Sequence, residues 1–175
     1  MDRIELTGYT PGALGRVIEF HGWYYARHWE LGMYFETRVA AELAELMSRF
    51  NPATDGAWFA RVNGEIVGSI FIDGGDAAGQ GARLRWFLIH PDYQGRGLGN
   101  LLMEAAMSFC RQAGFKRVYL TTFAGLNIAR HLYDKYGFRL CHEENGRELT
   151  GSDALTEQVL EVYLPVNDAP ATAAP

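Results

Sequence analysis

Apolar residues recur at helical spacing in the first part of the chain. Thr10 and Pro11 form a helix start signal, an N-cap residue followed by the residue favoured at the first helical position. Apolar or aromatic side chains then follow at positions 14, 17, 18, 21, 25 and 28. A second helix has apolar positions from Phe35 to Phe50 and ends before Pro52, because a residue that precedes proline is disfavoured in the helical region. This part of the chain therefore predicts two helices.

Short runs of β-branched and aromatic residues predict strands in the rest of the chain. Residues 57–62 and 65–72 flank Asn63 and Gly64, a pair that favours a tight hairpin turn because both turn positions need a positive φ. A glycine-rich loop covers residues 73–81. The later predicted elements are strand 83–89, helix 97–113, strand 118–122, helix 127–136, strand 138–142 and strand 158–164.

These elements predict a single α/β (α+β) domain over residues 1–164. We expect a mixed sheet of about seven strands with helices on both faces, which is a common sheet size. Residues 165–175 are rich in Ala and Pro and show no apolar period, so a disordered tail is expected there.

Composition excludes several classes of protein. The chain carries 16 Lys and Arg against 21 Asp and Glu, a net charge of −5, which argues against a nucleic-acid partner. Only Cys110 and Cys141 are present, and the histidines and cysteines show no metal-ligand spacing. The N-terminus has no apolar signal region, and no apolar run is long enough to cross a membrane. We therefore expect a soluble, cytoplasmic protein without a metal.

Residues 94–99, with the sequence Gln-Gly-Arg-Gly-Leu-Gly, lie between a predicted strand end and a helix start. Unpaired backbone N–H groups and the helix dipole favour an anion at such a position. The dinucleotide fingerprint is excluded because position 100 is Asn, and the Walker A loop is excluded because no Lys-Ser/Thr pair follows. The loop is thus a candidate phosphate site of another kind.

This loop resembles the signature of the GCN5-related N-acetyltransferases (GNAT), [Gln/Arg]-x-x-Gly-x-[Gly/Ala], through Gln94, Gly97 and Gly99. Residues 88–93 before it and residues 127–138 after it are similar to two further blocks of the family. The resemblance covers residues 4–164 and implies a GNAT-like, mostly antiparallel sheet. Residues 58–72 and 84–87 look most like the acetyltransferase half of MarR-type regulator fusions, whose winged helix would be missing here or encoded elsewhere.

The resemblance implies acetyl-CoA as co-substrate. Backbone N–H groups of the loop would hold the pyrophosphate, as the bare loop already suggests. Main-chain groups of Leu88 and Ile89 would pair with the pantetheine arm like an added strand. Asn127 and Arg130 would contact the cofactor from the following helix. The residues expected to bind acetyl-CoA are Leu88, Ile89, Gln94, Gly95, Arg96, Gly97, Leu98, Gly99, Asn100, Asn127 and Arg130.

Two catalytic roles are expected. Tyr133 matches the family tyrosine that protonates the leaving thiolate, and a phenol with a pKa of about 10 is protonated at neutral pH. It could instead be an ordinary core aromatic. The acceptor amine must lose a proton before it attacks, and Glu36 is the first candidate base, with His21 second. Glu36 could instead be a solvated first-turn carboxylate, and His21 a buried core histidine.

The sequence leaves three functions open. An acetyltransferase acting on a small primary amine is the first, and Arg83 or Arg85 would suit a carboxylate-bearing acceptor. A non-catalytic acyl-CoA sensor and a protein N-terminal or lysine acetyltransferase are the rivals. The sequence also leaves a homodimer possible. A dense aromatic cluster either belongs to the core or walls an acceptor pocket, and its members are Trp23, Tyr24, Tyr25, Trp29, Tyr34 and Phe35.

Overall fold

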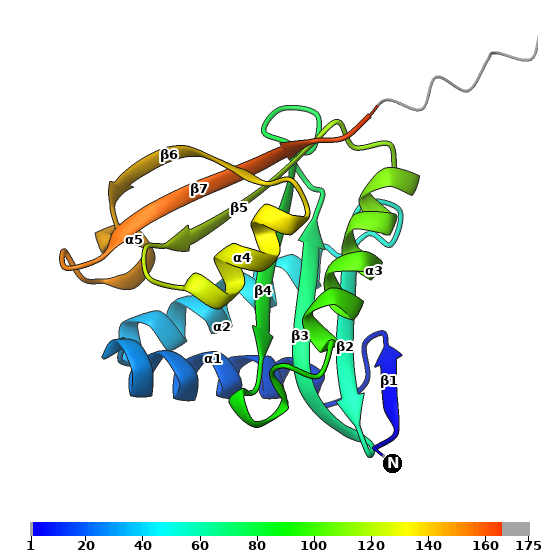
Figure 1. Cartoon of the computed structure of the whole chain (residues 1–175), viewed down its shortest axis with the longest axis horizontal. Coiled ribbons are helices and arrows are strands. Elements are labelled where there is room, and N and C mark those ends of the chain that lie inside the picture. Colours follow the sequence, from blue (N-terminus) through cyan, green and yellow to red (C-terminus); the bar gives the residue numbers. More distant parts are fainter. Residues whose placement is uncertain (1, 166–175) are drawn as a thin grey trace, which may run out of the picture.

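The computed structural model describes residues 2–165 and contains one seven-stranded sheet in the order β1-β2-β3-β4-β5-β7-β6 (Figure 1). Only β4 and β5 run parallel, and the other neighbours are antiparallel. The expected disordered tail lies outside the described residues from position 166 onward. The strands are β1 Ile4–Thr7, β2 Gly56–Val62, β3 Glu65–Asp73, β4 Ala82–Ile89, β5 Arg117–Phe123, β6 Arg139–Asn145 and β7 Thr156–Tyr163.

Helices cover both faces of the sheet, as the sequence predicted. Figure 1 shows α1 and α2 behind the sheet and α3 and α4 in front of it. A short 3-10 helix precedes α3, and a one-turn helix precedes β7. The helices are α1 Ala13–Trp29, α2 Met33–Ser48, η1 Pro91–Tyr93, α3 Leu98–Gln112, α4 Asn127–Lys135 and α5 Arg147–Thr150.

Two apolar clusters form the core, one on each face. The α3 and α4 face buries Leu102 and Met107 of α3 and Tyr133 of α4 against the sheet. The α1 and α2 face buries side chains such as Phe35 and Leu43. Helices with one apolar stripe can bury it only against a sheet face or another helix, so the observed layers follow from the spacing of the apolar residues.

The hairpin between β2 and β3 confirms the turn that the sequence predicted. Asn63 and Gly64 have φ values of 52° and 89°, and Val62 is the register partner of Glu65. Asparagine and glycine tolerate the left-handed region best, so these two residues fix the length of the turn and the register of both strands.

The N-terminal part differs from the prediction at two points. Helix α1 begins at Ala13 rather than at Pro11, because Gly12 takes a left-handed φ of 88° and interrupts the helical backbone. The sequence did not reveal β1, which pairs Ile4 with Val62 at the edge of the sheet. A strand of four residues with one neighbour has no burial pattern strong enough to identify it.

Candidate active site

A tight loop connects the end of β4 to the start of α3. Gly95 and Gly97 have φ values of 74° and 83°, a conformation that glycine adopts without strain. The side chain of Gln94 donates from Nε2 to the carbonyl oxygen of Ile89 at 3.0 Å and so ties the loop to the strand end. The backbone conformation therefore favours the predicted glycines at positions 95 and 97.

The loop presents free backbone donors. Within residues 2–165, the N–H groups of Gly95, Arg96 and Gly97 donate to no other group. The first N–H groups of α3, which begins at Leu98, have no partner inside the helix by geometry, and the helix dipole adds a partial positive charge. These donors fit an anion such as a pyrophosphate.

Strands β4 and β5 separate after a short parallel contact. Their register pairs end at Leu84 and Leu120, so residues 85–89 of β4 have only β3 as a neighbour. The backbone edge of this part of β4 is open and could pair with an extended ligand as an added strand does.

A backbone irregularity lies at the point of separation. Trp86 has a φ of 44°, which is rare for a bulky residue, and the register between β3 and β4 shifts beside it. The buried hydroxyl of Ser69 donates to the carbonyl oxygen of Trp86 at 2.8 Å. The bulge therefore reverses the alternation of side chains along β4. Each β4 side chain after the bulge lies on the opposite face of the sheet from the one that regular alternation would give.

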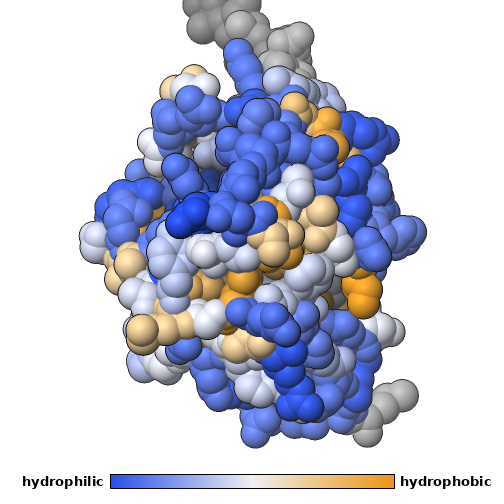
Figure 2. Space-filling view, turned by 90° about the vertical axis from the view of Figure 1, so that its left-hand side faces the viewer, coloured by the Kyte–Doolittle hydropathy of each residue, from blue (hydrophilic) through white to orange (hydrophobic). Residues whose placement is uncertain are grey.

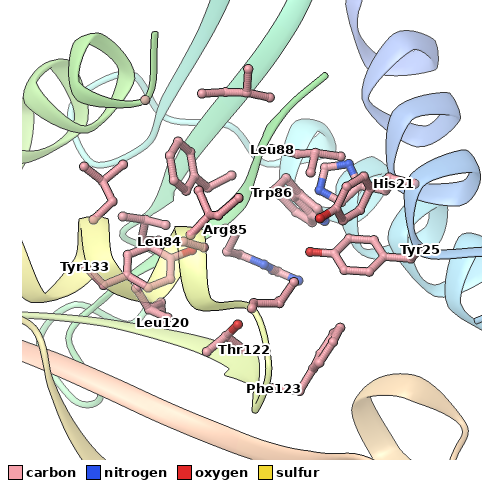
Figure 3. A pocket seen from close by; sticks show the side chains of 18 of the residues that line it. His21, Tyr25, Leu84, Arg85, Trp86, Leu88, Leu120, Thr122, Phe123 and Tyr133 are labelled. Atoms are coloured by element: carbon pink, nitrogen blue, oxygen red, sulfur yellow. The ribbon is translucent and has the colours of Figure 1, made fainter. Parts of the chain in front are cut away.

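A cavity of about 730 Å³ passes through the gap between β4 and β5. On one side it is lined by the loop and by α4, and on the other by α1 and α2. Figure 3 shows Tyr133 on one side of this space and Tyr25 and His21 on the other. Figure 2 shows apolar side chains gathered in the middle of one molecular face, bordered by hydrophilic ones. The cavity thus connects the two layers of the fold.

Tyr133 of α4 lies in the wall of the cavity. Its side chain is 6% exposed, and its ring contacts Phe87 and Phe138 at centroid distances of 6.0 and 5.9 Å. Its hydroxyl has no hydrogen-bond partner within residues 2–165 and faces the cavity (Figure 3). Burial raises the pKa of Tyr133 well above its usual value, so the phenol remains protonated.

Tyr25 and His21 face the same space from α1. Burial and the nearby Tyr133 and Tyr24 raise the pKa of Tyr25. His21 donates from Nδ1 to the Val17 carbonyl at 2.8 Å, and burial lowers its pKa to about 4, so the ring is neutral at pH 7. The remaining Nε2 atom can accept a hydrogen bond.

A chain of charged side chains borders the cavity between α2 and β4. Glu42 accepts hydrogen bonds from Arg38 Nε at 2.6 Å and from Arg85. Arg85 also donates to Asp73 at 3.2 Å, and its guanidinium lies 4.1 Å from the centre of the Trp86 ring. Both oxygens of Glu42 are thus occupied by arginines.

Most of the predicted cofactor residues meet at the cavity. Those that line it are Leu88, Ile89, Gln94, Gly95, Gly97, Gly99, Asn100 and Asn127. Three others lie beside it: the Arg96 side chain pairs with Asp2, the Leu98 side chain is in the core, and Arg130 pairs with Asp134.

Glu36, the first candidate base, does not reach the cavity lining. Its carboxyl group lies beside Gly22 of α1, within 2.7–2.8 Å of an ideal Cβ built there. At about 100° per residue, Glu36 and Glu42 flank the apolar stripe of α2 on opposite sides, so only Glu42 faces β4. The sequence showed the stripe but gave no reason to choose between its two edges.

The aromatic cluster predicted as either core or pocket wall has members of both kinds. Tyr24, Tyr25, Trp29 and Phe35 line the cavity, and Tyr25 and Phe35 also belong to the core. Trp23 and Tyr34 are 44% and 55% exposed and lie outside the lining. The sequence did not single out Arg38, Glu42 or Thr121, because the walls that they form depend on contacts between distant segments.

The fold and this cavity define an α/β protein with an anion-binding loop beside a split sheet. Residues 22–138 match the model of the Acetyltransferase (GNAT) family, and the chain belongs to that family. This result confirms the family resemblance and the expected fold class. Within residues 2–165, no helix is long and apolar enough to span a membrane, and no group of three or more His, Cys, Asp or Glu side chains could hold a metal ion.

Named relatives are similar over parts of their length. The uncharacterized N-acetyltransferase YjgM of Escherichia coli is 35% identical over 101 residues, which are 55% of this chain and 58% of YjgM. Mycothiol acetyltransferase of Rhodococcus jostii is 41% identical over 56 residues, 32% of this chain and 18% of that protein. These matches thus span less than two thirds of the relatives.

Solved structures share the fold. An acetyltransferase from Streptococcus agalactiae has a TM-score of 0.71 and 22% identity, covering 92% of this chain and 98% of its own. The putative acetyltransferase yncA from Salmonella typhimurium, solved with its cofactor acetyl-CoA, has a TM-score of 0.73 and 15% identity, covering 97% of this chain and 99% of its own. At these identities the likeness describes the fold alone.

Proposed function

We propose that this chain transfers the acetyl group of acetyl-CoA to a primary amine of a small molecule, by direct attack in a ternary complex. One observation carries the proposal: a single cavity connects the donor-rich loop, the open edge of β4, the Tyr133 hydroxyl and a chamber lined by α1 and α2. Family membership and the acetyl-CoA bound to the structural neighbour yncA support the same activity.

The residues around the loop fit acetyl-CoA. Of residues 94–99, Gln94 already donates its N–H to the Pro91 carbonyl, so the N–H groups of residues 95–99 would hold the pyrophosphate. Main-chain groups of Leu88 and Ile89 would pair with the pantetheine arm. Asn100 and Asn127 would contact the cofactor from the starts of α3 and α4. Arg130 would do so only after leaving its ion pair with Asp134. When bound, acetyl-CoA supplies an acetyl group activated as a thioester.

Tyr133 would act as the general acid. During transfer, a bond forms between the amine nitrogen and the acetyl carbon, and the carbon–sulfur bond breaks. The departing sulfur takes the phenolic proton of Tyr133, which regains a proton from solvent. The nitrogen loses a proton, so the products are an amide and a free thiol. The side chain of Tyr133 is largely buried, but its hydroxyl faces the cavity and has no hydrogen-bond partner within residues 2–165, which suits this donation.

Among the cavity-lining residues that the structure describes, none is a strong base for the acceptor. Glu42 is held by two arginines, and Glu36 lies outside the lining, so its role as base stays a prediction. Neutral His21 can accept a hydrogen bond from the amine, but a pKa of about 4 makes it a weak proton acceptor. We infer that His21 orients the amine, and that the ammonium proton leaves through water.

Two other functions fit parts of the structure less well. A non-catalytic acyl-CoA sensor needs the loop but gives no role to Tyr133 or to the chamber beyond it. The ribosomal-protein-alanine N-acetyltransferase of Brucella melitensis shares the fold at 13% identity, but a protein acceptor would be favoured by acidic walls. The lining formed by residues 2–165 has one carboxylate, Glu42, and three arginines. Cytoplasmic location, a homodimer and the likeness to MarR-type fusions stay predictions.

Thiol release tests the proposal. The purified chain is incubated with acetyl-CoA and a panel of primary amines, and free thiol is followed by a colorimetric reagent, with acetyl-CoA affinity measured separately by calorimetry. Amine-dependent release is the expected result. Binding of acetyl-CoA with no release for any amine would favour the sensor and contradict the enzyme. Release with amino-terminal peptides alone would indicate a protein acceptor.

A further inference from the structure

The chamber on the α1 and α2 side is rich in arginine. Arg38, Arg83 and Arg85 line it, whereas Glu42 is the one carboxylate on the lining formed by residues 2–165. Lining of this composition favours an anionic group on the ligand.

Arg85 and Arg38 are already engaged to different degrees. Arg85 pairs with Glu42 and with Asp73 and stacks on Trp86. Its side chain is only 9% exposed, so it is fixed in the wall. Arg38 donates from Nε to Glu42, and its two terminal nitrogens have no partner in the described part of the chain. Arg38 therefore retains donors that a ligand could use.

Arg83 is the arginine whose hydrogen-bond donors the described residues leave unsatisfied. Its Nε atom is the one buried side-chain nitrogen or oxygen without a hydrogen-bond partner in residues 2–165. One terminal nitrogen donates to Thr121 Oγ1 at 3.4 Å, which is a long contact. No carboxylate of the described residues lies within 4.0 Å of its guanidinium group. A buried charged donor without a partner destabilises a fold.

One acidic residue interacts electrostatically with Arg83 but does not fill this role. Glu157 of β7 lies opposite Phe123 of β5. Burial and Glu144 raise the pKa of Glu157, and Arg38 and Arg83 oppose that shift. The Glu157 carboxylate is thus close enough for both arginines to influence its pKa. Within residues 2–165, however, it forms no ion pair with either of them.

We infer that the acceptor is a primary amine that also carries a carboxylate, of the α-amino-acid class, and that Arg83 binds this carboxylate with help from Arg38. A guanidinium group presents paired N–H donors that match the two oxygens of a carboxylate. The aromatic walls formed by Tyr25, Trp29 and Phe35 fit an apolar side chain. This inference rests on the proposed acetyl transfer, and it names the acceptor of that same site.

Matched acceptors test the inference on the unmodified protein. L-phenylalanine is compared with 2-phenylethylamine, and L-leucine with 3-methylbutylamine, because the members of each pair differ only in the carboxylate. O-phosphoethanolamine serves as a phosphate-bearing amine. We expect kcat/KM to be about 10- to 100-fold higher for each carboxylate-bearing member, the range expected for a hydrogen-bonded charged contact.

Variants assign the preference to Arg83. Arg83→Gln should reduce the ratio of kcat/KM within each pair to nearly one while leaving acetyl-CoA affinity unchanged, and Arg83→Lys should restore part of the ratio. Arg111→Gln is the matched control, because Arg111 lies on the outside of α3 and pairs with exposed Glu104. The control should keep the full ratio.

The outcomes separate this inference from the proposed function. Thiol release that is equal within the pairs, or faster with the decarboxylated or phosphate-bearing amine, would overturn the inference and leave the acetyltransferase proposal intact. An unchanged ratio in Arg83→Gln would also overturn the assignment to Arg83. No release with any amine would overturn the proposed function and this inference together.

Discussion

At the scale of single residues, the Tyr133 hydroxyl has two properties that a proton donor needs. Desolvation keeps the phenol protonated, and the lack of a partner within residues 2–165 leaves its proton available to a ligand in the cavity. Helical spacing from the start of α4 placed Tyr133 on an inward face, but the sequence alone also allowed a plain core role. Its open hydroxyl is what favours the catalytic one.

Replacing Tyr133 by Phe should lower kcat by more than about tenfold, because general acid catalysis typically contributes about 10²- to 10⁴-fold. Acetyl-CoA affinity should remain nearly constant, since the aromatic ring keeps its contacts with Phe87 and Phe138. Steady-state thiol release and calorimetry measure the two quantities. Tyr163→Phe, at a 67% exposed position, is the control. Equal turnover of Tyr133→Phe and the unmodified protein would remove Tyr133 from the mechanism.

His21 should make stability depend on pH. Its pKa falls from 6.5 to about 4 on folding, so the unfolded chain binds the proton more tightly. Stability is therefore fully present above pH 6.5 and decreases as the pH falls toward 4, by about 3 kcal/mol in total. Urea unfolding at several pH values measures this loss.

A pair of variants isolates the His21 contribution. His21→Phe should flatten the dependence of unfolding free energy on pH between 6.5 and 4. His142→Phe should keep the slope of the unmodified protein, because the His142 side chain is 58% exposed. If both variants show the same slope as the unmodified protein, the buried neutral state of His21 is wrong.

At the scale of elements, those with a strong local sequence signal were predicted correctly, and those with a weak signal were not. The hairpin turn at Asn63 and Gly64 and the loop before α3 depend on residues that tolerate a positive φ, so their sequences were sufficient. The start of α1 was misplaced because Gly12 outweighs the cap signal of Thr10. The edge strand β1 depends on its pairing with β2, which a short local pattern does not show.

Two substitutions at Gly97 separate charge from backbone strain in the loop. Gly97 has a φ of 83°, and nothing lies within 4 Å of a Cβ built there. Asn and Asp are similar in size and both tolerate this φ better than other residues. Gly97→Asn should therefore keep most of the acetyl-CoA affinity, whereas Gly97→Asp places a negative charge beside the pyrophosphate and should weaken binding at least about tenfold more.

Calorimetry at low and high salt decides between the two effects. The difference in affinity between Gly97→Asp and Gly97→Asn should shrink as added salt screens the repulsion. Equal affinities for both variants at low salt would contradict an anion site at the N-terminus of α3.

At the scale of the whole molecule, the split between β4 and β5 creates the site. The sequence predicted the strands and the loop, but not that the strands would part after Leu84 and Leu120 or that α2 would bring Arg38 and Glu42 to the gap. These features depend on the rotation of α2 about its axis and on the bulge at Trp86. The cofactor half of the site was thus predictable from local motifs, and the acceptor half was not.

The split predicts where acetyl-CoA should protect the backbone from hydrogen exchange. If the cofactor pairs with the open edge of β4, amides in residues 85–89 and in the loop 94–99 should exchange more slowly when it is bound. Amides of β1 and β2, which lie at the far edge of the sheet, should be unaffected apart from a general gain in stability. Exchange followed by mass spectrometry of peptides measures both regions.

ADP, a shorter ligand, separates protection of the loop from protection of the open edge of β4. ADP carries a pyrophosphate but no pantetheine arm, so at saturating concentration it should slow exchange in residues 94–99 and leave residues 85–89 unchanged. Acetyl-CoA should slow both segments, because only its arm can reach along β4 into the gap beside Leu84. Protection of 85–89 by ADP would mean that the strand edge responds to the loop rather than to a paired ligand. Absence of protection there with acetyl-CoA would place the arm outside the gap.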